Sequence, residues 1–243
     1  MHEQIGEHAF WHLPVLGAVH SDTILTTWLV MILALPFFAW VGMSYRSARV
    51  SGRQTVIEGL VNYIADLTNS TIGKKGEPYV PFFFALFVFI FLLNEIGFLP
   101  FKAFSLPFGG SPTADLNTTV AYAIMVFLVI QVSGIRKEGL RFFAHLVKPF
   151  WPMLPINLLE EIVRPITLTL RLFFNIFIGE LLLFVVYQII TSQIKIGPFD
   201  LSLAAAIMPF FLQIFNFLIG ALQAFVFVLL SIVYLSLALA DEH

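Results

Sequence analysis

Five long apolar segments constrain this chain more than any other feature. A helix of about 20 apolar residues spans the roughly 30 Å of hydrocarbon in a bilayer. Three segments have this ordinary length, at residues 24–43, 80–99 and 118–135, and two are longer, at 157–192 and 200–239. The longer two exceed one upright span, so we expect a hairpin of long, tilted helices. The sequence predicts one all-α, polytopic membrane domain with five transmembrane helices.

The composition is typical of a protein whose solvent is lipid. Hydrophobic residues make up 59% of the chain and charged residues 12%, with a mean hydropathy of +0.91, whereas soluble domains carry about 25% charged residues. A net charge of -2 gives no basic field for nucleic acid, and the lack of cysteine excludes disulfides, thiol catalysis and thiolate metal sites. We expect neither a cofactor nor a metal, because the spacing of the N-terminal histidines fits no standard site: His2, His8, His12 and His20.

Two further segments are candidates for helices that lie in the membrane interface. Residues 54–72 carry apolar side chains on one helical face, which are Val56, Ile57, Leu60, Val61, Ile64 and Leu67. The opposite face is polar, with Glu58, Asn62, Asp66 and Asn69. Residues 138–150 are a second candidate, and Asn157 with Glu160 has the spacing of a capping pair that opens the fourth span.

The basic residues predict the orientation of the chain. Lysine and arginine accumulate on the cytoplasmic side of membrane proteins, and ten of the 13 here fall on one side of the five spans: Arg46, Arg49, Arg53, Lys74, Lys75, Arg136, Lys137, Arg141, Lys148 and Arg164. Lys102 and Lys195 fall on the other side. We expect the N-terminus outside and the C-terminus in the cytoplasm. The acidic first residues are unlike a secretory signal, so we expect them to belong to the mature chain.

Arg171 is the most unusual residue of the fourth span. A charged side chain at the middle of a membrane helix costs about 2.5–3.5 kcal/mol on insertion scales, so something must compensate it. Helical periodicity aligns Arg171 with three other polar residues in one seam, namely Glu160, Arg164 and Asn175. Snorkelling or pairing with a buried carboxylate is the structural alternative to a functional role.

Other polar residues of the last two spans fall at related depths. Glu180 lies half a turn round the helix from Arg171, which favours a position lining a water-filled cavity, although pairing with another helix is an alternative. The fifth span carries Gln213, Asn216, Gly220 and Gln223 on one face, where amides can also simply join helices. A hairpin centred near Lys195 predicts that Arg171 lies level with Gln223, and Asn175 with Asn216.

Two acidic residues stand at the ends of the other spans. Glu95 follows Asn94 near the outer end of the second span, where a channel-lining role is one interpretation. Asp115 precedes the third span, and its position favours an N-cap over a channel role.

Three sequence motifs resemble those of subunit a, the membrane stator and ion channel of F-type ATP synthases. They are the run at residues 154–181, which contains Arg-Leu-Phe-Phe-Asn, the Gly-Ala-Leu-Gln-Ala-Phe-Val-Phe run that starts at Gly220, and the Pro-Thr-Ala-Asp-Leu-Asn-Thr-Thr run that starts at Pro112. The resemblance implies a non-catalytic subunit of the Fo sector (also written CF(0)) that adjoins a rotating ring of c subunits with membrane-buried carboxylates. It also implies b-type peripheral stalk subunits, a soluble ATPase head and an energy-transducing membrane such as the bacterial plasma (inner) membrane.

The resemblance also assigns roles to residues. Arg171 matches the family's essential arginine, which prevents an ion short-circuit between two aqueous half-channels. The residues that match the half-channels or the surroundings of the arginine are Asn175, Glu180, Asn216 and Gln223. Further candidates for half-channel lining are Glu95, Asp115, Glu160, Glu161, Arg164 and Gln213. Phe174 stands where many members have glycine, and Asn216 where some bacterial members have a histidine that titrates.

The implied mechanism couples proton or sodium transport to rotation and hence to ATP synthesis. An ion enters through one half-channel, neutralises a ring carboxylate, and leaves through the other half-channel after nearly a full turn of the ring. A secondary ion transporter is the alternative, but such proteins usually show inverted repeats and broken helices. A purely structural anchor would leave the depth of Arg171 without a reason.

Overall fold

The computed structural model of this chain is built almost entirely from helices. It describes residues 10–13, 17–43, 52–97, 111–139, 142, 151–191, 195–196, 199–200 and 207–240. The α-helices are α1 (Ser21–Met43), α2 (Gly52–Ile72), α3 (Val80–Ile96), α4 (Leu116–Glu138), α5 (Leu154–Thr191) and α7 (Met208–Leu239). Short 3₁₀ helices are η1 (Gly73–Tyr79), η3 (Pro112–Ala114) and η5 (Trp151–Met153).

Two small antiparallel hairpins are the departure from an all-helical chain. One pairs β1 (Phe10–Leu13) with β2 (Gly17–His20), and the other pairs β3 (Lys195–Ile196) with β4 (Phe199–Asp200). Each has four residues or fewer per strand, so they connect or precede helices without forming a sheet core.

Five helical stretches among the described residues are long and apolar enough to cross a membrane, which confirms the predicted class. They are Ser21–Trp40, Gln54–Ile96, Leu116–Glu138, Trp151–Ile189 and Met208–Leu239. The second stretch joins α2, η1 and α3, and its apolar part is α3. The helix of the fifth span begins at Met208, and Asp200, where the sequence predicted its start, lies in β4.

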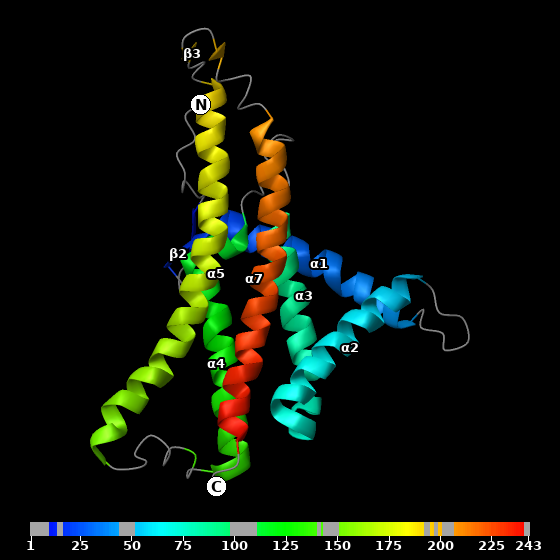
Figure 1. The fold of residues 1–243 in the computed structure, drawn as a ribbon, viewed down its shortest axis with the longest axis vertical. Coiled ribbons are helices and arrows are strands. Elements are labelled where there is room, and N and C mark those ends of the chain that lie inside the picture. The colour runs from blue at the N-terminus through cyan, green and yellow to red at the C-terminus, as the bar shows by residue number, and fades with distance from the viewer. Residues whose placement is uncertain are drawn as a thin grey trace.

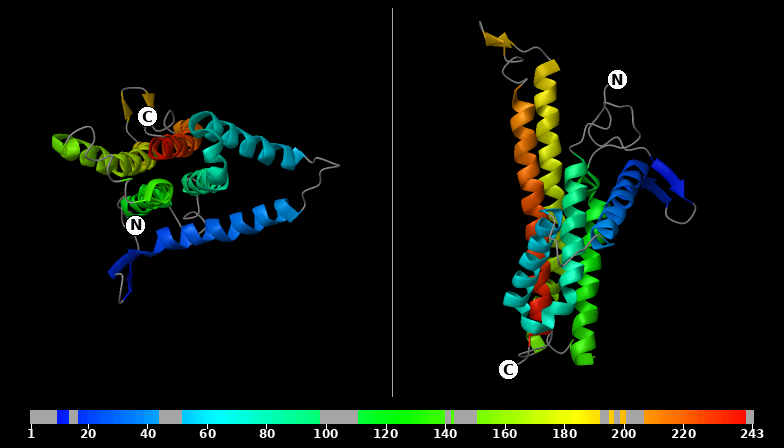
Figure 2. Two further views of the ribbon diagram at one scale, coloured as in Figure 1. Left: turned by 90° about the horizontal axis from the view of Figure 1, so that it is seen from below. Right: turned by 90° about the vertical axis from the view of Figure 1, so that its right-hand side faces the viewer.

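The helices form three rows when viewed along the bundle (Figure 2). One row holds α5, α7 and α2, the next holds α3 and α4, and α1 crosses on the far side. Both long helices of the first row pack against α4, and α7 also packs against α3. The opposite face of the α5 and α7 pair is covered by no described element (Figure 1). Many large apolar side chains of these two helices are exposed.

A continuous apolar core joins α3, α4, α5 and α7. Its fully buried members include Phe83 and Ile90 from α3, Val126 from α4, Leu172 from α5 and Phe227 from α7. Lipid is as apolar as these side chains, so close van der Waals packing, more than exclusion from water, stabilises these contacts. The core fixes the mutual positions of the four helices that carry the polar residues of interest.

The long hairpin has a different register from the one predicted. β3 and β4 pair Lys195 with Asp200 and Ile196 with Phe199, so the two strands pair about a point two or three residues beyond Lys195. If the point about which a helical hairpin pairs moves by two or three residues, each residue of one helix lies opposite a residue of the other helix about twice that many positions from the expected one. In the structure, Asn175 lies opposite Gln223, and Asn216 opposite Gly179, one helical turn from the expected pairs.

The sequence predicted two helix N-caps, of which one is confirmed and one is wrong. Asp115 caps α4, because its side chain accepts a hydrogen bond from the Asn117 backbone at 2.9 Å, as predicted. The predicted cap at Asn157 is wrong, because α5 already begins at Leu154. Pro155 is tolerated in that first turn, since the first amides of a helix have no intrahelical partner.

The helix α2 has the two faces expected of it. Ile64 is buried and Leu60 half-buried, while Asn62 and Asp66 are exposed. Val56 departs from the pattern, because it is exposed near the start of the helix. The second expected interfacial segment, residues 138–150, lies largely outside the described residues.

Basic residues gather around the C-terminal end of α7. Lys137 Nζ donates to the carbonyls of Leu239 and Ala240, at 3.0 and 2.7 Å, and so caps that helix. Lys74 and Lys75 line a cavity beside the same residues. The structure thus brings together members of the basic set that the sequence assigned to one side of the membrane.

Candidate functional site

Arg171 projects from the middle of α5 on the face that no described element covers. Its side chain is exposed, and it has no hydrogen bond or ion pair with any described residue. Phe174 and Ile178 follow it on the same face, and each is nearly half exposed. The structural alternative of a fixed carboxylate partner is therefore absent from the described part of the chain. Among the residues that the structure describes, the guanidinium is a lone cation on this apolar face.

Two amide contacts join α5 to α7 next to the arginine. Asn175 Nδ2 donates to Gln223 Oε1 at 2.7 Å. One turn further along α5, Asn216 Nδ2 donates to the Gly179 carbonyl at 3.4 Å. Gln223 and Asn216 are 3% and 2% exposed, so both amides lie inside the bundle.

Glu180 faces away from Arg171, as its half-turn offset predicted. Its Oε1 accepts a hydrogen bond from the Ser111 backbone amide at 2.7 Å. Ser111 continues a chain of hydrogen bonds, because its hydroxyl lies 2.6 Å from the Thr113 hydroxyl, which donates to Asn94 Oδ1 at 2.7 Å. The last hydrogen bond of this series joins Asn94 Nδ2, which donates, to the Gly220 carbonyl at 3.0 Å. We call this group the outer polar cluster, after the side of the membrane that the sequence predicts for it. It comprises Glu180, Ser111, Thr113, Asn94 and Gly220 and connects α5, η3, α3 and α7.

Glu95 and Gln213 lie beside the outer polar cluster. They line a cavity of about 380 Å³ whose other walls are apolar side chains of α1, α3 and α7. Glu95 Oε1 is buried and has no hydrogen-bond partner among the described residues. The two residues come from helices that Figures 1 and 2 both show side by side.

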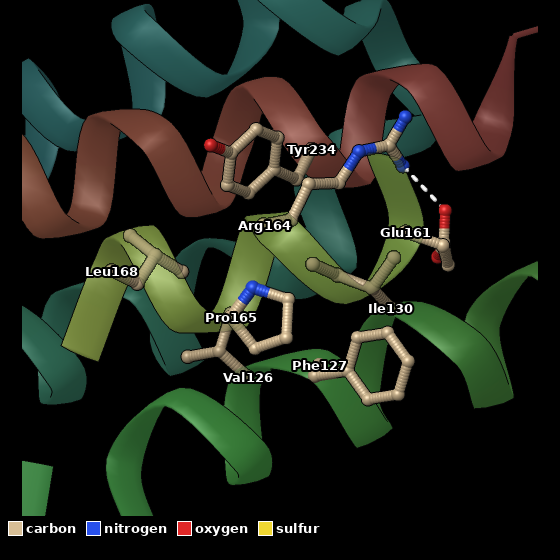
Figure 3. A pocket seen from close by; sticks show the side chains of 8 residues that line it. All are labelled: Val126, Phe127, Ile130, Glu161, Arg164, Pro165, Leu168 and Tyr234. Atoms are coloured by element: carbon tan, nitrogen blue, oxygen red, sulfur yellow. Dashed lines mark hydrogen bonds and ion pairs between the residues drawn. The ribbon is translucent and has the colours of Figure 1, made fainter. Parts of the chain in front are cut away.

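A second polar group lies nearer the start of α5 (Figure 3). Arg164 donates to Glu161 Oε2 at 2.9 Å, and its guanidinium lies 5.6 Å from the centre of the Tyr234 ring. Gln131 of α4 donates to the other oxygen of Glu161. We call Glu161, Arg164, Gln131 and Tyr234 the inner polar cluster. Two small cavities border it, of about 10 and 100 Å³, and the larger is also lined by Glu138.

The remaining predicted residues lie apart from both clusters. Glu160 is exposed on α5, beside the buried Glu161. The seam predicted for α5 is therefore divided, because Arg164 turns to Glu161 and Asn175 turns to Gln223. Asp115 caps α4 and its Oδ2 lies 2.7 Å from His20 Nδ1. This pair borders another cavity, of about 550 Å³, which neither cluster lines.

Sequence reasoning missed several members of the two clusters. Gln131, Tyr234, Ser111 and Thr113 come from segments where no polar periodicity marks them. Gln131 is a single amide near the end of an apolar span. Its position inside that span is the feature of the sequence that could have identified it. Ser111 and Thr113 precede the α4 cap by a few residues, so they read as turn residues.

The sequence of this chain also matches a model of a known protein family. A family model described as ATP synthase A chain matches residues 24–236. The match covers three of the five apolar stretches entirely and all but three residues of the first and the last. It also includes Arg171 and both polar clusters. The resemblance seen in the motifs is thereby confirmed, and this chain belongs to the ATP synthase A chain family, whose members are membrane subunits of the Fo sector.

Proposed function

We propose that this A chain passes the coupling ion to and from a ring of c subunits, with Arg171 at the point of transfer. One observation carries the proposal: the arginine is exposed, has no described partner, and stands among exposed apolar side chains on an uncovered face. A lone cation in lipid is costly, so this face requires a partner that brings negative charge. A ring of carboxylates supplies one at every step of rotation.

Arg171 would act by keeping each passing carboxylate ionised. A positive charge nearby favours the charged form of an acid, so the ring carboxylate must release its ion before it passes the arginine. The same charge repels free cations and prevents direct leakage. Each elementary charge that crosses contributes about 2.3 kcal/mol per 100 mV of membrane potential, and the ring converts that energy into rotation.

The two polar clusters are suited to be two separate half-channels. Glu180 follows Arg171 by nine residues and Glu161 precedes it by ten, which is about 14 and 15 Å along the helix. The outer half-channel would be lined by Glu180, Asn216, Glu95 and Gln213. The inner one would be lined by Glu161 and Arg164, with exposed Glu160 at its edge. Arg171 would lie between the two half-channels, next to the hydrogen-bonded pair of Asn175 and Gln223, while the contacts of Asp115 support a capping role.

The same proposal assigns an orientation and partners. The basic residues around the C-terminal end of α7 favour that end as the cytoplasmic one, and hence an outer N-terminus. A bacterial plasma (inner) membrane or an equivalent energy-transducing membrane suits this arrangement. The uncovered apolar face of α5 and α7 would meet the ring. The lipid-facing α1 and the cytoplasmic end are the surfaces left for b-type stalk subunits, which would link the chain indirectly to the soluble catalytic head.

Replacing the arginine in the assembled complex tests the proposal. In Arg171→Ala, we expect a complex that contains ring and head but neither pumps ions on ATP hydrolysis nor synthesises ATP. Leu182→Ala is a matched control, because Leu182 is an exposed side chain on the same face, three turns further along. Normal ATP-driven pumping by Arg171→Ala would refute the role. Isolation of a functional chain without ring or head would favour a secondary ion transporter.

A further inference from the structure

Glu95 is an acidic side chain with two different surroundings. Its Oε1 is buried and has no hydrogen-bond partner among the described residues. The side chain as a whole is only half-buried, and it lines the cavity of about 380 Å³ together with Gln213. One oxygen thus points into the bundle while the residue remains in contact with an open space.

The buried oxygen lies against the backbone of Gly220. A Cβ added at Gly220 would lie 2.5 Å from Glu95 Oε1, much closer than real Cβ contacts, so a side chain there would displace the carboxyl group. The neighbouring Asn94 donates to the Gly220 carbonyl and holds α3 at this level of α7. The absence of a side chain at position 220 is what allows the carboxyl to approach.

Glu95 also adjoins the hydrogen-bonded chain that leads to Glu180. Asn94, the residue before it, is linked through Thr113 and Ser111 to the Glu180 carboxylate. Asn216, one turn before Gly220 on α7, carries an amide that cannot titrate. Among the members of the outer polar cluster and the residues that line the cavity beside Glu95, Glu95 and Glu180 are therefore the side chains able to bind and release a proton.

We infer that Glu95 is a proton-exchanging residue of the outer half-channel, and that Gly220 provides the space for its carboxyl group. This inference rests on the proposed function. A lone ionised carboxylate without a partner is costly inside a bilayer, and a bound proton removes that cost. The cavity side gives the carboxyl access to protons from outside, and the buried side faces α7. Hard metal cations such as Ca²⁺ take six or more oxygen ligands, whereas a proton needs only one, so a single free oxygen suits a proton.

Two substitutions of Glu95 distinguish a proton-transfer role from a packing role, because the two roles predict opposite orders of activity for the two variants. Glu95→Gln keeps the shape of the side chain but removes the carboxyl group that binds and releases a proton. Glu95→Asp keeps a carboxyl group but shortens the side chain. In the whole complex in proteoliposomes, we expect ATP-driven proton uptake in Glu95→Gln to fall by about tenfold or more, because positioned proton transfer contributes about 100-fold or more. We expect Glu95→Asp to retain at least about half of the wild-type rate, since the acid persists.

Gly220→Ala is the second variant, because the added methyl group would displace the carboxyl. We expect it to lower proton uptake, and we expect the double variant with Glu95→Gln to be no worse than Glu95→Gln alone. Ile32→Ala, at an exposed position on α1, is the control that should keep the wild-type rate.

Two results would overturn the inference: full proton uptake by assembled Glu95→Gln, or a Glu95→Asp complex that is slower than Glu95→Gln. Arg171→Ala is measured beside them. If that complex is inactive and Glu95→Gln is normal, only the role of Glu95 fails; if Arg171→Ala also pumps normally, the proposed function fails.

Discussion

Asn175 and Gln223 join the two longest helices through a hydrogen bond of 2.7 Å, one turn beyond Arg171. Asn175 is exposed on the open face, whereas Gln223 is almost fully buried. The bond therefore links the surface that carries the arginine to the interior of the bundle. Gln223 keeps its Nε2 without a described partner, so a hydrogen-bond donor remains available inside the bundle close to this contact.

Removal of this bond should weaken coupling less than removal of the arginine does. In Gln223→Leu, α5 and α7 lose one interhelical hydrogen bond, and such bonds contribute about 0.6 kcal/mol on average in membrane proteins. The charge of Arg171 remains in place. We expect ATP-driven ion pumping to be reduced but still measurable in proteoliposomes with matched amounts of complex.

A double-mutant cycle separates the bond from other roles of the amides. If the bond is the main contribution, Asn175→Leu, Gln223→Leu and the double variant should show similar losses. A Gln223→Leu complex as inactive as Arg171→Ala would mean that the amide takes part directly in ion transfer.

The close approach of Gly179 to Asn216 leads to a second prediction. An added Cβ at position 179 would lie 2.9 Å from Asn216 Oδ1, so the buried amide would have to move. We expect Gly179→Ala to lower both the pumping rate and the melting temperature of the solubilised complex. Gly59→Ala is the matched control, because a Cβ there meets no atom within 4 Å and alanine favours a helix. Equal behaviour of the two variants would contradict the prediction.

The sequence indicated which segments are helical more reliably than which side chains meet. Span lengths follow from bilayer thickness, and the Asp115 cap follows from a local interaction, so both were predictable. The pairing of Asn175 with Gln223 depends on where the hairpin turns, and an error of two or three residues there moves every partner by one helical turn. Contacts such as that of Gln131 with Glu161 depend on helix rotation in the packed bundle, which no single span encodes.

Asp115 provides a test between capping and ion conduction. Asp115→Asn retains an oxygen that can cap α4, whereas Asp115→Ala removes it, at a cost of about 1 kcal/mol. Both variants lose the carboxylate that faces His20 at 2.7 Å. We expect Asp115→Ala to lower the melting temperature more than Asp115→Asn, and we expect Asp115→Asn to pump ions at nearly the wild-type rate. Loss of pumping by a stable Asp115→Asn complex would instead assign Asp115 to the outer half-channel.

The inner polar cluster should respond asymmetrically to loss of its two charges. Glu161 is buried and accepts hydrogen bonds from both Arg164 and Gln131, whereas Arg164 is partly exposed and also rests against Tyr234. Arg164→Ala therefore leaves a buried carboxylate with one described neutral partner, a change that costs about 1–3 kcal/mol or more. Glu161→Gln instead leaves the Arg164 guanidinium without its charged partner, and this group can turn toward solvent. We expect the melting temperature of the complex to fall further in Arg164→Ala than in Glu161→Gln, and to recover in part when both changes are combined, because no unpaired buried charge then remains. Equal destabilisation by the two single variants would show that the pair is held by packing and not by the need to compensate the Glu161 carboxylate.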